Sequence, residues 1–448
     1  MVKTRTKFVC QQCGTSFPKW TGKCENCSAW NSLLEQAPIA EGKSVIARSQ
    51  GQKLVAKKIK DVKIDAVSNR LSSGFDDLDA VLGGGLMSGG VVLVAGQPGI
   101  GKSTLLMQMS AKISYSDSVL YVSGEESASQ VKLRAERLGA KDNEKLDLAS
   151  STSADDVATT ILDGHYKLVV IDSMQTMQMA DIASAPGTVS QITNSASIII
   201  RAAKATDTAV ILVGHVTKEG SIAGPKVLEH IVDVVLQFEG DKYGGFKLVR
   251  ANKNRYGSTT EVAIFDMKDS GLELVKNPSE ALLAERRDVD GSIILATLEG
   301  SRPLLVEIQA LVNATSFGYP NRTASGFDLN RLKLLIAVLE RRTKLKLADK
   351  DIYINVVGGL KLDDPAADLA VCMAIASAAA EKKLRQGAVV FGEIGLGGEI
   401  RSASMFDKRI AEAKKLGFKY AIAPKSAAKD KFVVPAADLR DALNQHLK

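Results

Sequence analysis

The chain has 448 residues, of which 45% are hydrophobic and 24% are charged, and its formal net charge is +7. This length exceeds one ordinary hydrophobic core and predicts about two to three domains, while the mild positive charge permits an anionic partner without identifying one. The apolar stretch Leu369 to Ala380 is interrupted by Ser377 and is too short to span a bilayer, and Met1 to Thr6 leads into no hydrophobic signal region. We therefore expect a cytoplasmic protein with no membrane partner.

The first predicted module, residues 1–34, carries four of the five cysteines. They form two pairs with two residues between the members of each pair: Cys10, Cys13, Cys24 and Cys27. A small residue follows each pair, Gly14 or Ser28, which lets backbone N–H groups turn toward sulfur. This spacing predicts a tetrahedral Zn²⁺ site, and a module so small would depend on the metal for its stability. Two disulfides are the alternative, which a cytosolic location disfavours.

A linker is predicted over residues 35–65. The stretch from Glu35 to Asp65 mixes Ala, Gly, Gln and several lysines with little hydrophobic periodicity. From about residue 66 to residue 275, short apolar runs alternate with helical patterns. That alternation is typical of a doubly wound α/β domain with a parallel sheet.

The predicted strand Val91 to Ala95 leads into a phosphate-binding loop, and Ser103 to Ile113 is predicted to form the helix that follows. The loop matches the pattern G-x-x-x-x-G-K-[ST] and consists of Gly96, Gln97, Pro98, Gly99, Ile100, Gly101, Lys102, Ser103 and Thr104. Backbone N–H groups would surround the phosphates of ATP, Lys102 would reach the terminal phosphates, and the Ser103 hydroxyl would bind Mg²⁺. A glycine-rich turn without a ligand is the alternative, which the strand and helix on either side disfavour.

Two further predicted strands end in carboxylates. Leu168 to Ile171 leads to Asp172, predicted to hold Mg²⁺, and Val119 to Ser123 leads to Gly124, Glu125 and Glu126. Ligands of open α/β sheets lie at the carboxyl edge of the strands, so we expect Glu125 to act there as the general base. The alternatives are an ordinary turn for Asp172 and, for the glutamates, a helix start that favours acidic side chains and could be capped by Ser123 or Ser127.

The last predicted features of this domain are polar. The strand Val210 to Gly214 ends at His215, which could contact the γ-phosphate or merely cap the strand. The segments between Met174 and Gln191 and from Thr217 to Lys226 are predicted mobile loops that could face the channel of a ring. Lys253 and Arg255 follow the predicted strand Phe246 to Ala251. They are either solvated turn residues or cations that stabilise transferring phosphate, a choice that spacing alone leaves open.

A second α/β domain is predicted over residues 280–448, because the pattern restarts near Asn277 to Ser279. Its expected strands and helices are Gly291 to Ala296, Pro303 to Gln309, Asn330 to Arg341 and Pro365 to Ala380. Cys372 lies in the last of these, an alanine-rich helical pattern, and is expected to be packed core.

With these motifs located, the chain resembles the bacterial RadA (Sms) family of RecA-like DNA-repair ATPases over nearly its full length. The resemblance depends on the cysteine module, the phosphate loop, the stretch Gly124 to Ser127, the signature Lys253 to Gly257 and the terminal domain. It implies a hexameric ring that translocates on single-stranded DNA and promotes branch migration of branched DNA with the recombinase RecA. It also implies that Glu125 activates water and that Lys253 and Arg255 act on nucleotide held by the adjacent subunit.

The terminal domain resembles the proteolytic domain of Lon. Lon's nucleophile motif, Gly-Pro-Ser-Ala-Gly, is replaced here by Asp364 to Asp368, so that Ala366 takes the place of the serine, and the position of the catalytic lysine falls on Arg409. The stretch Gly392 to Gly398 keeps the Lon pattern. We therefore expect a proteolytically inactive scaffold that helps assemble the ring and contributes basic surface toward DNA.

The sequence thus predicts a DNA-stimulated ATPase motor, a probable DNA helicase by family resemblance, with a zinc module for partner or DNA contact. Two alternatives stay open. One is an ATP-dependent Lon-like protease, which an alanine in the nucleophile's place disfavours. The other is a nucleotide-switched DNA-binding scaffold that does not translocate.

Overall fold

The computed structural model describes residues 7–10, 15–26, 28–30, 32–36, 58, 70–140, 143–215, 226–240, 246–315, 318–425 and 430–447. The chain divides into two compact units, residues 1–63 and residues 64–448. Among the described residues, no helix is both long and apolar enough to cross a membrane.

The first unit contains a three-stranded antiparallel sheet in the order β2-β1-β3. Its strands are β1 (Lys7–Cys10), β2 (Ser16–Phe17) and β3 (Leu33–Gln36). The buried side chains of Cys10, Cys24 and Leu33 form its small core, against which Phe8 and Phe17 pack. Glu35 and Gln36 belong to β3 rather than to the linker predicted from Glu35, and of residues 37–65 only Lys58 is described.

The second unit begins with a nine-stranded sheet in the order β12-β11-β10-β9-β4-β8-β7-β5-β6. The strands from β9 to β6 in this order are parallel, as predicted for a doubly wound fold, and β10, β11 and β12 extend the sheet with antiparallel pairs. The strands are β4 (Val91–Gly96), β5 (Val119–Ser123), β6 (Leu146–Ser150), β7 (Leu168–Asp172), β8 (Ala209–His215), β9 (Val234–Gly240), β10 (Lys247–Asn254), β11 (Val262–Lys268) and β12 (Gly271–Leu274).

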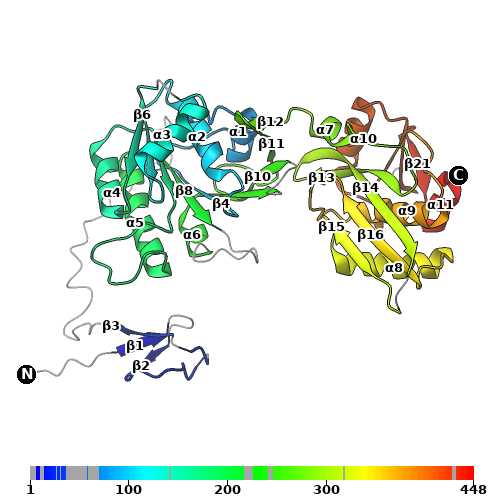
Figure 1. Cartoon of the computed structure of the whole chain (residues 1–448), viewed down its shortest axis with the longest axis horizontal. Helices are drawn as coiled ribbons and strands as arrows, with labels where there is room; N and C mark the ends of the chain where they lie inside the picture. The colour runs from blue at the N-terminus through cyan, green and yellow to red at the C-terminus, as the bar shows by residue number, and fades with distance from the viewer. Residues whose placement is uncertain are drawn as a thin grey trace, which may run out of the picture. The chain divides into compact units, whose positions relative to one another are not determined.

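Helices cover both faces of this sheet (Figure 1), which explains why its central strands are buried along their whole length. One face packs against α1 (Asp76–Leu82), α2 (Lys102–Ile113) and α3 (Ala128–Arg137). The other packs against α4 (Ala154–Asp163), α5 (Val189–Ala205) and α6 (Lys226–Ile231). The predicted strands and the helix after the phosphate loop are therefore confirmed.

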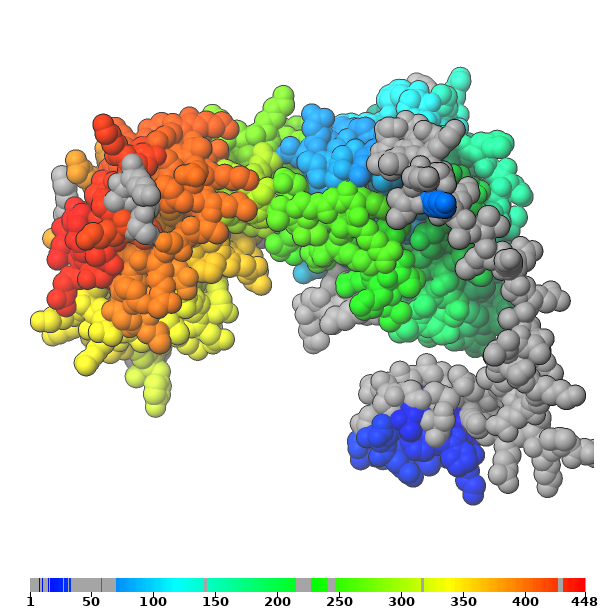
Figure 2. Space-filling model, turned by 180° about the vertical axis from the view of Figure 1, so that it is seen from behind, coloured from blue at the N-terminus to red at the C-terminus, as the bar shows by residue number. Residues whose placement is uncertain are grey.

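A seven-stranded mixed sheet follows, in the order β15-β16-β14-β13-β17-β20-β21. Its strands are β13 (Ser292–Glu299), β14 (Arg302–Ala314), β15 (Arg322–Ser325), β16 (Lys350–Val356), β17 (Ala388–Val390), β20 (Tyr420–Pro424) and β21 (Val433–Ala436), and β18 (Glu393–Ile394) pairs separately with β19 (Ile400–Arg401). Its helices are α7 (Pro278–Leu283), α8 (Leu329–Thr343), α9 (Ala367–Ala380), α10 (Phe406–Lys415) and α11 (Leu439–His446). In the space-filling view, the orange to red segments late in the chain form one continuous face of this domain (Figure 2).

Helix α9 is the central helix of this core. Most of its own side chains are small or apolar, with no polar face, and the helix is buried from Ala367 to Ser377. Cys372 is fully buried there, and burial raises the pKa of its thiol well above the usual value, so the predicted core role of Cys372 is confirmed. The same core includes Leu248 on β10 and Val262 and Ile264 on β11, so the two sheets of this unit share apolar contacts.

Candidate functional site

The phosphate loop begins where β4 ends and turns directly into α2. Gly96 must be a glycine, because a Cβ atom there would lie 2.8 Å from the backbone oxygen of Phe238 on β9. Gly101, the N-cap of α2, has φ of 116°, a left-handed conformation that side chains disfavour. The loop therefore presents the N-terminus of a buried helix to the carboxyl edge of the sheet, a geometry suited to phosphate.

Lys102 lies beneath this loop and is almost wholly buried. Its Nζ donates hydrogen bonds to the carbonyl oxygens of Gly96, at 2.9 Å, and Gln97, at 3.0 Å. Burial lowers the pKa of its ammonium to about 8, although the negative charges of Asp172 and Glu125 act in the opposite direction. The sequence-predicted lysine and both predicted carboxylates thus belong to one electrostatic site.

Asp172 ends β7 as predicted and is buried. The Tyr121 hydroxyl on β5 donates a 2.7 Å hydrogen bond to its Oδ2. The register pairs Ser123 with Asp172, so Tyr121 reaches this carboxylate from two positions earlier on the neighbouring strand. Burial, followed by the charge of Asp172, raises the pKa of Tyr121 well above its usual value, so the phenol stays a donor. A buried carboxylate with one oxygen held by a hydrogen bond is a type of oxygen ligand that suits Mg²⁺.

The two neighbouring glutamates have different partners. Ser173, which follows β7, donates a 2.6 Å hydrogen bond from Oγ to Oε1 of Glu125. Glu126 instead forms an ion pair with Arg134 on α3. The N-cap residue of α3 is Ser127, as the alternative interpretation allowed, and its side chain forms a reciprocal capping box with Gln130. These contacts favour Glu125 over Glu126 as the general base, since only Glu125 bonds to the residue after Asp172.

His215 ends β8, and its backbone pairs with Gly96 at the start of the phosphate loop. Its side chain and residues 216–225 lie outside the described part of the chain, so its predicted phosphate contact stays a prediction, as does the predicted mobility of that loop. Within the stretch from Thr217 to Lys226, only Lys226, the first residue of α6, is described.

The segment from Met174 to Gln191 is a predicted mobile loop with few bulky anchors apart from its methionines, and its residues 178–190 are exposed or partly exposed, so its mobility stays a prediction. Met174 and Met177 are fully buried. The Gln191 side chain accepts from Met179 N and donates to carbonyl oxygens within the segment, including that of Ile182 at 2.9 Å. The last residues of the segment already belong to α5.

The sequence predicts that the signature from Lys253 to Gly257 follows a strand. This prediction is wrong for its first two residues, because β10 continues through Lys253 to Asn254. Lys253 Nζ donates to the carbonyl oxygens of Glu229, at 2.6 Å, and Val232, at 2.8 Å, at the end of α6. Burial is the largest influence on Lys253 and lowers its pKa.

Arg255 pairs with Asp233 of its own chain at 3.1 Å. The other carboxylate oxygen of Asp233 accepts from the backbone N of Val91 at 3.1 Å, so the ion pair is fixed to the start of β4. Both cations of the signature therefore have partners within the chain, and the Arg255 side chain is also 52% exposed, so its role as a phosphate-stabilising cation stays a prediction.

The cysteine module contains two turns of the same form. Cys10 N donates to Thr15 O at 3.0 Å, and Cys24 N donates to Ala29 O at 2.8 Å, so each cysteine begins a turn closed five residues later. Both cysteines are buried, which suits thiolates that face a shared metal. Cys13 and Cys27 lie outside the described residues, so the complete predicted zinc ligand set stays a prediction.

The place of the Lon dyad is filled by a buried ion pair. Arg409 is fully buried and donates from Nη1 to Asp364 at 2.7 Å and to the carbonyl oxygen of Ala296 at 2.6 Å. Asp364 also accepts from the backbone N of Ala366 at 3.0 Å and of Leu298 at 3.2 Å. The guanidinium is thereby held in place, and Ala366 offers only a methyl group.

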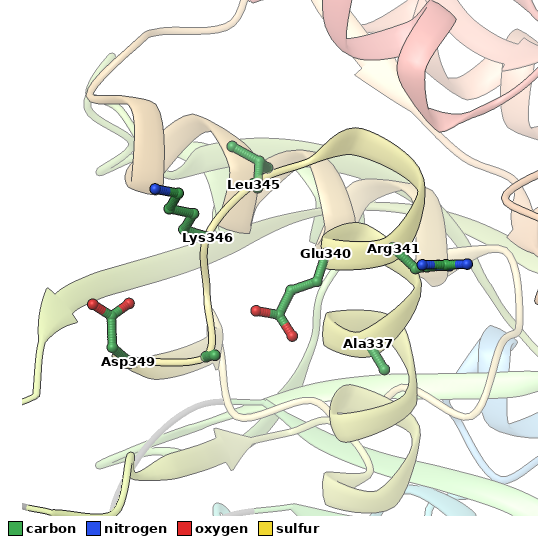
Figure 3. A pocket seen from close by; sticks show the side chains of 7 residues that line it. Ala337, Glu340, Arg341, Leu345, Lys346 and Asp349 are labelled. Carbon is green, nitrogen blue, oxygen red and sulfur yellow. The ribbon is translucent and has the colours of Figure 1, made fainter.

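A hollow of about 640 Å³ opens between α8 and the loop after it. Figure 3 shows the Glu340 carboxylate between the helix and this loop. Glu340 Oε1 accepts from the backbone N of Leu347 at 3.0 Å. Its carboxylate thus closes the loop, and the hollow lies on the C-terminal domain rather than at the phosphate loop.

Comparisons with known proteins agree with this arrangement. Residues 8–35 match the family described as rubredoxin metal binding domain, residues 58–221 match the AAA domain, and residues 328–427 match subunit ChlI of Mg-chelatase. The predicted order of a zinc-ribbon domain, a P-loop domain and a Lon-like domain is thereby confirmed.

Proteins named DNA repair protein RadA are similar along the whole chain. The chain is 48% identical to that of Bacillus subtilis and 47% identical to that of Halalkalibacterium halodurans, with 95% of this chain and 93% of each relative covered. It is 45% identical to that of Listeria monocytogenes, with 99% of both chains covered. The chain belongs to the RadA family.

Proposed function

We propose that the chain is a cytoplasmic, ATP-hydrolysing, DNA-stimulated motor of homologous recombination and DNA repair. In this proposal a hexameric ring translocates on single-stranded DNA and promotes branch migration with RecA. The observation that supports it best is the site at the carboxyl edge of the first sheet, where Lys102 is influenced by both Asp172 and Glu125. The similarity to proteins named DNA repair protein RadA supports the repair role.

The residues suggest how hydrolysis would proceed. The loop amides and Lys102 would bind the phosphates of ATP, exchanging the carbonyl contacts of Lys102 for phosphate oxygens. Asp172 and Ser103 would hold Mg²⁺, which neutralises charge on the phosphates. Glu125, oriented by Ser173, would accept a proton from the attacking water.

In a ring, Lys253 and Arg255 would act on the nucleotide of the neighbouring subunit. Arg255 would first have to leave Asp233, its partner in the isolated chain. The guanidinium is about half exposed, but Asp233 is only 5% exposed and would lose its cation, so assembly of the ring would have to offset that loss. A cation delivered only in the assembled ring would make hydrolysis depend on assembly.

A protease is disfavoured, since Ala366 supplies no nucleophile and Arg409 is always cationic and engaged by Asp364. A nucleotide-switched scaffold remains the competing function. It would require slow ATP hydrolysis that single-stranded DNA does not change.

The adjacent glutamates offer a matched test of the site. Glu125→Gln should keep nucleotide binding but lower phosphate release by about 10²- to 10⁴-fold, because the general base is lost. Glu126→Gln removes the same charge one residue away and should retain most activity, having lost only the Arg134 pair.

Phosphate release should be measured with and without single-stranded DNA, together with displacement of an annealed strand. Loss of activity in Glu126→Gln alone would reverse the assignment. A wild-type rate that DNA leaves unchanged, without strand displacement, would favour the scaffold.

A further inference from the structure

The two tryptophans of the chain lie in the first unit, and both are exposed. The exposed fractions are 55% for Trp20 and 74% for Trp30. A Cβ atom at Gly22 would lie 3.9 Å from Trp20 Cη2 and 3.9 Å from Trp30 Cζ3. The six-membered rings of both indoles therefore lie close to Gly22, and each side chain exposes more than half of its surface to solvent.

The backbone around this pair is held by the cysteine turn. Trp30 forms an antiparallel bridge with Lys23, next to the turn that Cys24 N closes with Ala29 O. On the other side, Thr21 Oγ1 donates to Lys23 O at 2.8 Å. The two indoles are thus presented by a short, hydrogen-bonded hairpin, which lowers the entropic cost of binding a ligand.

The sequence of the module carries a positive net charge, and one of its lysines lies beside an indole. Residues 1–34 contain five basic residues and one acidic residue. Lys19 and Lys23 are exposed, and Lys23 Nζ lies 5.8 Å from the centroid of the Trp30 ring. Flat aromatic faces beside lysines match a ligand with flat rings joined by anionic links.

We propose that Trp20 and Trp30 form a stacking platform for the bases of single-stranded DNA, with Lys19 and Lys23 at its phosphates. The proposal rests on the proposed DNA-dependent function and adds a contact site outside the ATPase domain. An acidic peptide would use the lysines but would leave both indole faces without a stacking partner, so the surface fits a nucleic acid better.

The position of the tryptophans permits a direct assay. All tryptophan emission of the full-length protein arises from this unit, because the chain has two tryptophans and both lie there. The zinc-loaded, nucleotide-free protein is titrated with a thymidine oligomer and with an abasic oligomer of the same length. Dye-labelled versions of both report total binding by anisotropy. Stacking predicts quenching by the thymidine oligomer and little quenching by the abasic oligomer, which offers phosphates alone.

Substitutions then separate stacking from folding. Trp30→Ala should weaken binding of the thymidine oligomer by about 5- to 150-fold, the equivalent of about 1–3 kcal/mol per stacked base. Trp30→Phe should restore much of the affinity, since a phenyl ring still stacks. Tyr115→Ala removes an aromatic ring that is 73% exposed in the other unit and should change nothing. Zinc per chain should be equal in all variants, which shows that the module has folded.

Other outcomes would overturn the proposal. Equal quenching by both oligomers would mean that phosphate contacts suffice. Wild-type affinity for thymidine oligomer in both Trp20→Ala and Trp30→Ala would leave the indoles as a surface for a protein partner. If neither oligomer changes the anisotropy, the DNA-binding function itself fails, which is a distinct result from binding without quenching.

Discussion

Removing one oxygen atom should free the Asp172 carboxylate, the proposed Mg²⁺ ligand, from the hydrogen bond that holds it. Tyr121→Phe deletes the hydroxyl that donates to Asp172 Oδ2 at 2.7 Å and keeps the ring, which is 1% exposed and packs in the core. The carboxylate would then lose the neighbour that fixes one of its oxygens. We expect it to turn toward Lys102, the nearby cation, and away from the position that suits Mg²⁺.

The size of the effect follows from the type of bond. A hydrogen bond to a charged group contributes about 1.5–3 kcal/mol, and loss of a partner that orients a metal ligand lowers metal affinity by about 10- to 100-fold. The Mg²⁺ concentration for half-maximal binding of a fluorescent ADP analogue should therefore rise at least about tenfold. Binding of the analogue in EDTA should be unchanged, because the loop amides and Lys102 remain.

Tyr166→Phe is the matched control. Tyr166 also donates to an aspartate, Asp147 Oδ2 at 2.8 Å, but this bond is exposed and lies outside the site. The control should leave the Mg²⁺ dependence unaltered. If Tyr121→Phe lowers the melting temperature while the Mg²⁺ dependence stays that of the wild type, the hydroxyl serves folding alone and our reasoning is wrong.

Two further predictions concern the C-terminal domain. Arg409→Met should destabilise the domain by about 3–5 kcal/mol in denaturant unfolding, because it leaves the Asp364 carboxylate buried without its cation; a loss below about 1 kcal/mol would show that the other donors to Asp364 suffice. His446 is buried, and burial followed by Arg385 lowers its pKa, although Asp441 opposes the shift. The unfolded chain therefore binds the proton more readily, so the contribution of His446 to stability is present above about pH 6.5 and is lost as the pH falls below that value. Unfolding at pH 7.5 and pH 5.5 should show a smaller acid loss in His446→Phe than in the wild type, and identical losses would refute this origin.

The sequence predicts the elements of the ATPase site well because each depends on a local pattern. The run Leu168 to Ile171 must be a buried strand, and the residue after it must reach the sheet edge. The same reasoning fails for Tyr121, since a tyrosine in an apolar strand indicates packing. Only the adjacency of β5 and β7, which are separated by three elements in the chain, brings its hydroxyl to Asp172.

Other differences also depend on contacts that the local sequence pattern does not show. Gln191 anchors the preceding segment through one side-chain amide, a role that composition does not reveal. Lys253 extends β10 because its backbone pairs with Val235 on β9. The sequence pattern does not identify Asp233, yet its carboxylate links Arg255 to the start of β4. In each case the missing information is which residue the fold brings alongside, from nine positions away for Gln191 to 142 positions away for Asp233.

The replaced Lon dyad shows why two substitutions would not be enough to recreate a protease. A lysine at position 409 would meet Asp364, whose oxygens already accept from Thr297, Leu298 and the backbone of Ala366. That carboxylate would favour the charged ammonium, whereas a general base must be neutral. A serine at position 366 would thus have a neighbouring cation rather than a base. The carboxylate that stabilises the present fold is itself the obstacle to the chemistry, which argues that this domain serves the protein through its structure.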